Sequence, residues 1–108
     1  MMVKSNIKIL SLLGFAQKAG KLISGINTVE SLIGNTQIKL LIIAVDSPAK
    51  FLKQMENKCV NLGQSYLIFG TKDELGQAIG KSARSIIAVK DKNIAGAILD
   101  YIKTTSQL

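Results

Sequence analysis

Several residue types that support catalysis or metal binding are missing or rare in this chain. Its 108 residues include no histidine, no tryptophan, one cysteine and one proline. Histidine is the side chain that most readily exchanges protons near neutral pH. The chain therefore lacks the residue most often used in acid–base catalysis. No Cys or His cluster has metal-ligand spacing, and we expect neither a metal nor another cofactor. The lone Cys59 cannot form an intrachain disulfide, which favours a cytoplasmic setting.

Acidic residues are also scarce. Seven Asp and Glu stand against fourteen Lys and Arg, a net charge of +7, and Lys4, Lys8, Lys18 and Lys21 all precede the first acid, Glu30. A polyanionic partner would account for this balance, because each phosphate that a protein neutralises releases counterions. Charge that serves solubility alone is the simpler alternative.

An anionic membrane surface could attract the same charge. The first helix, however, is apolar over most of its circumference, which is typical of a buried helix rather than one that lies on a surface. The apolar run is too short and too interrupted to span a bilayer, and no small-residue cleavage site follows it. We therefore expect a soluble, monomeric, cytoplasmic protein without a membrane partner.

Helix and strand patterns alternate along the chain without a linker or repeat. Apolar residues at three- and four-residue spacing predict helices over 6–19, 27–33, 48–62, 71–79 and 92–103, and aliphatic runs predict strands over 21–24, 38–45, 66–69 and 86–89. Residues 1–108 are thus predicted to form one domain, an α/β protein with a three-layer α/β/α sandwich. In this prediction Cys59 and Leu62 lie on the apolar stripe of the third helix. Capping signals mark three helix starts: Asn27 with Glu30, Ser47 before Pro48, and Thr71 with Glu74.

Two features could indicate an enzyme. Asp46 follows the central strand, where α/β enzymes often keep a catalytic carboxylate. A hydrogen bond to the start of the helix at Pro48 explains this acid more simply. Gly80-Lys81-Ser82 ends like a nucleotide-binding loop, but the leading glycine is replaced by Leu75. We therefore expect no enzymatic activity.

Two loops combine small residues with hydrogen-bond donors. One runs from Gly20-Lys21 to Gly25-Ile26-Asn27, where a helix N-terminus offers free amides to an acceptor and Asn27 could read a base edge. The other is Lys81–Arg84, between a helix and a strand. Sharply bent RNA exposes unstacked bases and closely spaced phosphates, which small rigid loops of this kind can contact. A solvated turn is the alternative for Lys81 and Arg84.

Four motifs carry a resemblance to a known family: LGFAQKAGKLISG, LLIIAVDSP, KC and ELGQAIGKSARSIIAV, over residues 13–25, 40–48, 58–59 and 74–89. The chain resembles the kink-turn RNA-binding ribosomal protein family (the L-seven-Ae and L-thirty-e type), and more closely its bacterial YlxQ-like branch. The resemblance implies a mixed four-stranded sheet between helices and binding to a kink-turn or related structured RNA.

The resemblance also suggests roles for individual residues. In that family a Gly-x-Asn-Glu-x-x-Lys pattern contacts the tandem G·A pairs of the bend; Gly25 and Asn27 match it, whereas Thr28 and Ser31 replace the Glu and Lys. The loop before the last strand cradles an extruded base in the family, and Ala83 occupies that place here.

The sequence therefore predicts a non-catalytic RNA-binding protein in which the two loops form one continuous face. A protein-interaction module on the same fold, with weak or no RNA binding, is the alternative, and an enzyme that uses Asp46 is a distant third. The predicted RNA-binding residues are Lys18, Lys21, Gly25, Asn27, Thr28, Lys81, Ser82, Ala83 and Arg84.

Overall fold

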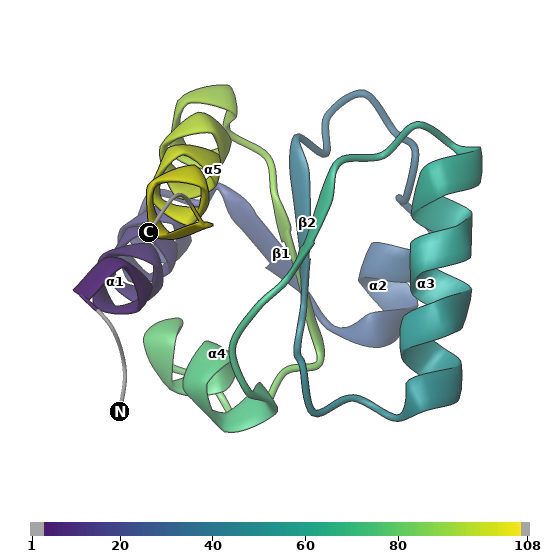
Figure 1. The fold of residues 1–108 in the computed structure, drawn as a ribbon, viewed down its shortest axis with the longest axis horizontal. Helices are drawn as coiled ribbons and strands as arrows, with labels where there is room; N and C mark the ends of the chain where they lie inside the picture. The colour runs from purple at the N-terminus through teal and green to yellow at the C-terminus, as the bar shows by residue number, and fades with distance from the viewer. Residues whose placement is uncertain (1–3, 107–108) are drawn as a thin grey trace.

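The computed structural model describes residues 4–106 and places a β-sheet between two layers of helices (Figure 1). The elements follow one another in the order α1 (Lys4–Lys18), β1 (Leu22–Ser24), α2 (Ile26–Glu30), β2 (Leu40–Ile43), α3 (Ala49–Asn61), β3 (Tyr66–Ile68), α4 (Lys72–Ala78), β4 (Ile86–Val89) and α5 (Lys92–Ser106). The predicted alternation of helices and strands is confirmed, although the second and third strands are shorter than the aliphatic runs that predicted them.

The four strands form a mixed sheet with the order β1-β4-β2-β3. β2 pairs parallel with β3, whereas β4 runs antiparallel to both β1 and β2, and Val89 lies opposite Leu22 on one side and Leu40 on the other. Every residue of the central strands β2 and β4 is buried. Their continuous aliphatic runs match a sheet that helices cover on both faces.

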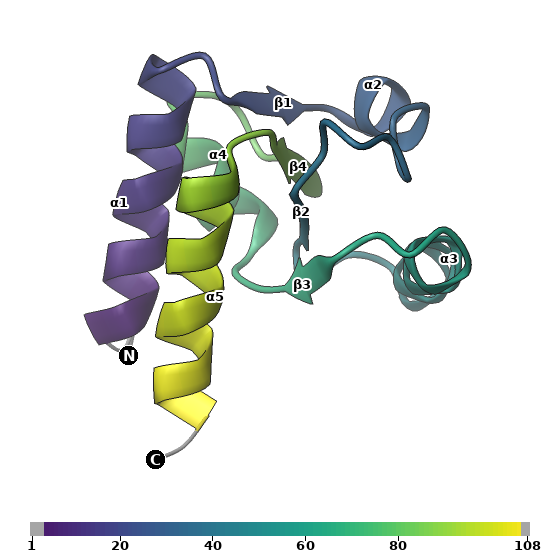
Figure 2. The same cartoon turned by 90° about the horizontal axis from the view of Figure 1, so that it is seen from above.

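The helices divide into two layers. Figure 2 shows α1, α4 and α5 on one face of the sheet and α2 and α3 on the other. Ile9 and Leu13 of α1 are fully buried in the core on the first face, and Met55 and Cys59 of α3 lie in the core on the second. The three-layer α/β/α sandwich predicted from the sequence is confirmed, as is the core position of Cys59.

The predicted capping box at the start of α4 is present. The Glu74 amide donates to Thr71 Oγ1 at 3.1 Å, and the Thr71 amide donates to Glu74 Oε1 at 2.9 Å. Beyond the other end of α4, Gly80 has a φ of 71°, in the left-handed region where glycine carries no steric penalty. The helix before the Lys81–Arg84 loop is therefore anchored at both ends.

Two predicted caps are wrong. The N-cap of α2 is Gly25, whose φ of 103° suits glycine, so Asn27 falls inside the first turn and caps nothing. α3 begins at Ala49 with Pro48 as its N-cap. The Ser47 hydroxyl is buried without a hydrogen-bond partner among the described residues, and no side chain caps the start of α3.

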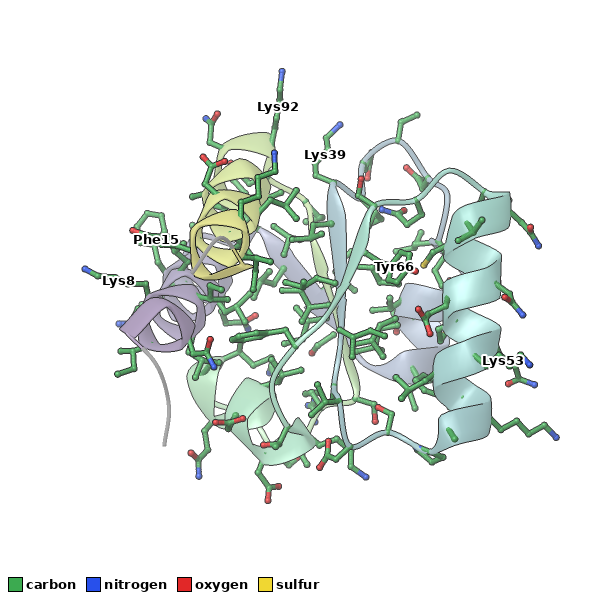
Figure 3. The ribbon with its side chains drawn as sticks, viewed as in Figure 1. Lys8, Phe15, Lys39, Lys53, Tyr66 and Lys92 are labelled. Carbon is green, nitrogen blue, oxygen red and sulfur yellow. The ribbon has the colours of Figure 1, made fainter. Side chains whose placement is uncertain are left out.

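Some predicted burial is also wrong. Ile7 and Phe15 of α1 are 54% and 62% exposed, so α1 is buried along one side only. Figure 3 shows Phe15 pointing away from the sheet. Leu62 is 50% exposed because α3 ends at Asn61 and the chain turns before the stripe is complete. Asp46 accepts a hydrogen bond from the Lys72 amide, at 2.9 Å, and so stabilises the start of α4 rather than the helix after Pro48.

Candidate nucleic-acid interface

The two loops singled out by the sequence meet at one end of the sheet. β1 ends at Ser24 and β4 begins at Ile86, and the two strands are antiparallel, so the turn after β1 lies beside the loop before β4. Together they line a surface hollow of about 380 Å³. Its lining, which we call the Asn27 hollow, consists of Ser24, Gly25, Ile26, Asn27, Ala83, Arg84 and Ser85. The predicted shared face of the two loops is confirmed.

The Arg84 guanidinium is held in place from both sides. Its Nε donates to Ser24 Oγ at 3.2 Å, which joins the β4 loop to β1. One terminal nitrogen, Nη1, donates to Ser82 Oγ at 2.9 Å and to the Ser82 and Ala83 carbonyls at 3.2 Å. Among the described side chains no carboxylate pairs with Arg84, and the one ion pair joins Lys58 to Glu30. A charged guanidinium oriented in this way is suited to a phosphate group, to which its second terminal nitrogen, Nη2, can donate.

The turn that carries Asn27 has little bulk. Gly25 places no side chain over the start of α2, and no side chain caps the first amides of this helix. Asn27 is exposed, so its amide can both donate and accept a hydrogen bond. Ile26 is exposed beside it and adds an apolar surface on which a base can rest. Backbone, amide and apolar surface are therefore all open to an incoming nucleotide.

Close packing against α4 fixes the opposite loop. The Lys81 amide donates to the Gly76 carbonyl at 2.8 Å, and the Arg84 amide donates to the Lys72 carbonyl at 3.0 Å. A Cβ atom at Gly76 would lie 2.2 Å from the Ser82 carbonyl oxygen, so only glycine lets the loop approach the helix so closely. Gly76 therefore positions Ala83 and Arg84 from outside the hollow.

The remaining candidates in these loops lie next to the hollow rather than in its lining. Thr28 follows Asn27 on α2 and is exposed. Its carbonyl accepts a hydrogen bond from the Ser31 hydroxyl at 2.8 Å. Lys81 is exposed on the loop, and Ser82 is exposed while it supports Arg84. These positions can extend the contact area around a ligand in the hollow.

Lys18 and Lys21 are not part of this surface. Lys18 lies near Gly80 in a separate depression between α1 and α4. Lys21 precedes β1 and therefore lies at the opposite end of the sheet, where its carbonyl accepts the Lys90 amide at 2.9 Å. The sequence grouped Lys21 with Gly25 because the two are close along the chain, but a strand separates them.

Sequence reasoning missed three residues of the site. Ser24 and Ser85 line the hollow, and Ser24 anchors Arg84. Serine carries no distinctive pattern, so no sequence signal pointed to either position. Gly76 was visible as a glycine inside a helix, where it costs about 1 kcal/mol relative to alanine and often has a packing reason.

In a small α/β protein, a hollow that holds an exposed asparagine and an arginine without a carboxylate partner among the described residues fits a nucleic-acid-binding class. The matching family model, the ribosomal protein L7Ae/L30e/S12e/Gadd45 family, covers residues 7–98. The chain belongs to this family. None of its described helices has both the length and the apolar composition needed to cross a membrane.

Individual relatives agree with the family model. The chain is 31% identical over 98 residues to the RNA-binding protein YlxQ of Bacillus subtilis, covering 91% of this chain and 98% of the relative. It is 30% identical over 95 residues to the large ribosomal subunit protein eL8 of Cenarchaeum symbiosum, covering 87% of this chain and 75% of the relative.

Two solved structures share the fold. A protein of unknown function from Bacillus halodurans superposes with a TM-score of 0.83 at 33% identity, covering 89% of this chain and 97% of that one. The Giardia lamblia 15.5kD RNA binding protein superposes with a TM-score of 0.78 at 17% identity, covering 99% of this chain and 92% of that one. At that low identity the second likeness concerns the fold alone.

Proposed function

We propose that this protein binds structured RNA with a sharp bend, of the kink-turn or a related type, through the Asn27 hollow and without a catalytic step. The observation that carries the proposal is the Arg84 guanidinium, which two serines orient and no described carboxylate neutralises, in one hollow with the Asn27 amide. Family membership supports it, as does the similarity over most of the chain to a relative described as RNA-binding.

In this proposal different residues of the hollow bind different parts of the RNA. Arg84 binds a backbone phosphate, and such a contact sets affinity without reading sequence. Asn27 hydrogen-bonds to base edges, which are accessible only where the RNA is unstacked. Ala83 and Ile26 provide a small floor for an extruded base. Lys81, Ser82 and Thr28 make further contacts at the edge of the hollow, and the protein acts as a cytoplasmic RNA-binding domain.

The test compares two RNAs with the same arms, one bent by a kink-turn and one a continuous duplex. We expect the wild-type protein to bind the bent RNA more tightly in fluorescence anisotropy. Arg84→Ala should weaken binding to both RNAs, because the loss of a phosphate contact is independent of sequence and shape. Ala83→Glu should abolish binding, because it places an unpaired negative charge where bases and phosphates must lie.

Lys53→Gln is the matched control, since it also removes one positive charge but lies on α3 and points away from the sheet (Figure 3). If Lys53→Gln weakens binding as much as Arg84→Ala does, the Asn27 hollow is not the site. If the wild-type protein binds neither RNA, the protein-interaction alternative replaces the proposed function.

A further inference from the structure

A second basic surface lies at the other end of the sheet. It is a hollow of about 420 Å³ lined by Gly20, Lys21, Thr36, Gln37, Lys39 and Lys90, which we call the lysine hollow. Its three lysines come from segments far apart in the sequence: one precedes β1, one precedes β2 and one follows β4. Because β4 runs antiparallel to β1 and β2, these three positions meet at one end of the sheet.

No negative charge lines this hollow. Among the described side chains none of its lysines forms an ion pair, and Lys90 is partly buried. The Lys39 ammonium group donates to the Thr36 carbonyl at 2.7 Å, which restricts it to the wall of the hollow. The adjacent acid, Asp91, is occupied as an acceptor for the Ile94 amide at 2.9 Å, at the start of α5.

A fourth lysine lies at the same end. Lys92 is the first residue of α5, a helix of 15 residues, and Figure 3 shows Lys39 and Lys92 extending in the same direction. A helix N-terminus carries a partial positive charge, so a lysine there is electrostatically unfavourable for folding. Four cations therefore gather where their mutual repulsion, and the helix dipole, lower stability. A ligand that brings negative charge would relieve this repulsion.

We propose that the lysine hollow binds the phosphate backbone of a second segment of the same RNA, so that the protein contacts its ligand at both ends of the sheet. This inference rests on the proposed function. The charged side chains that line the hollow are all lysines, and no aromatic side chain on which a base could stack lines it. Lysines act as point charges toward phosphate, which suits a helical arm without sequence specificity.

The two hollows act as separate electrostatic sites. Ser85 and Lys90 flank β4, which puts the hollows roughly 17 Å apart at about 3.3 Å per strand residue. That distance exceeds the Debye length of about 8 Å at physiological ionic strength. An RNA confined to the Asn27 hollow would hardly sense the lysine hollow, whereas an RNA with a longer arm would contact it directly.

The experiment uses the full chain, its Lys39→Gln/Lys90→Gln double variant and the bent RNA with either a short arm or a long arm. For the long-arm RNA the double variant should bind about tenfold more weakly, and its log–log salt slope should fall in magnitude by about 1.4–1.8 for two lost phosphate contacts. For the short-arm RNA, affinity and slope should remain as in wild type. Lys39 is exposed and Lys90 is partly buried, so circular dichroism melting checks that the variant folds.

Lys8→Gln/Lys53→Gln is the matched control, since it removes the same charge from α1 and α3, where both side chains point outward (Figure 3), and neither residue lines either hollow. Equal losses in the two double variants would overturn the inference, because they would indicate general electrostatics. An unchanged long-arm affinity in Lys39→Gln/Lys90→Gln would overturn it too. Vesicles with phosphatidylserine test a membrane: if the double variant loses only vesicle binding, the hollow serves a membrane and not RNA.

Failure of the proposed function has a different signature. In that case wild-type protein shows no preference for bent RNA over duplex, and Arg84→Ala has no effect. Loss of long-arm binding in Lys39→Gln/Lys90→Gln would still identify the lysine hollow as a phosphate site. Arg84→Ala therefore tests the proposed function, and Lys39→Gln/Lys90→Gln tests the lysine hollow independently of it.

Discussion

Asn27 lies in the first turn of α2 with its side chain exposed, and the N-cap role belongs to Gly25. Replacement by alanine should therefore leave stability within about 0.5 kcal/mol of wild type, as for most surface substitutions. Preference for bent RNA over duplex should fall by about 1–3 kcal/mol, because the amide no longer reaches base edges. Thermal melting and anisotropy titrations measure the two effects. A lowered melting temperature with unchanged RNA preference would contradict the role proposed for Asn27.

Cys59 illustrates how burial controls chemistry at a single residue. Burial, followed by the nearby Glu56 carboxylate, raises the pKa of the Cys59 thiol above its usual 9.0, and the smaller effect of Lys58 opposes this. The native thiol should therefore remain protonated and react slowly with a disulfide reagent at pH 8, at a rate set by unfolding. Rapid labelling of the native protein would contradict this prediction.

The same shift determines how stability depends on pH. Because the folded-state pKa is the higher one, the contribution of the protonated thiol is complete below about pH 9.0 and is lost as the pH rises above it. A Cys59→Ala variant should show a weaker alkaline dependence than wild type, with a remainder from Tyr66, whose pKa the hydrogen bond to Glu56 also raises. Urea denaturation at pH 8 and pH 10 measures the difference. An identical pH dependence in both proteins would contradict the assignment.

At the scale of elements, the contact between α4 and the Lys81–Arg84 loop gives the sharpest prediction. Gly76→Ala should destabilise the protein by about 1–3 kcal/mol, because the new methyl group overlaps the Ser82 carbonyl and pushes the loop outward. RNA affinity should fall as well, since Arg84 moves with the loop. Urea denaturation and anisotropy measure the two losses.

Gly96→Ala provides the matched control for this substitution. Gly96 lies in the interior of α5, and a Cβ atom there meets nothing within 4 Å. The change should stabilise the protein by about 0.5–1 kcal/mol through helix propensity. Equal destabilisation by both substitutions would show that the effect at Gly76 is not the close approach of the loop.

The elements were largely predictable because their signals are local. Continuous aliphatic runs predicted β2 and β4, and the pair Thr71 and Glu74 predicted the start of α4. The errors arose where a side chain's partner depends on tertiary structure. Asp46 bonds to Lys72, which lies far along the chain, and the exposure of Phe15 depends on which side of α1 the other helices cover.

The same distinction applies to the site. Small residues beside hydrogen-bond donors mark both loops, so the sequence could predict that Gly25, Asn27, Ala83 and Arg84 share one face, and the structure places all four in one hollow. The sequence could not predict that Lys21 lies apart from these four residues. Its position follows from the direction of β1 and from the pairing of β1 with β4.

For the whole molecule, charge distribution predicts the response to salt. With Lys21 at the far end, three cations remain in or beside the loop at the Asn27 hollow: Lys72, Lys81 and Arg84. A short bent RNA should therefore give a log–log salt slope of about −2 to −3. Titrations between low and moderate salt measure this slope, and a flat response would remove the electrostatic argument for RNA binding.

The pairing of β1 with β4 has a consequence for how the protein is made. Leu22 pairs with Val89, and the Arg84–Ser24 bond joins residues 60 positions apart, so both hollows need early and late parts of the chain together. A chain still emerging from the ribosome carries the basic N-terminal segment long before β4 is available to complete the sheet. Synthesis at about 5–20 residues per second leaves it in that state for several seconds. Under the proposed function, specific recognition would therefore begin only when translation has passed β4, and a partly made chain would attract RNA by charge alone.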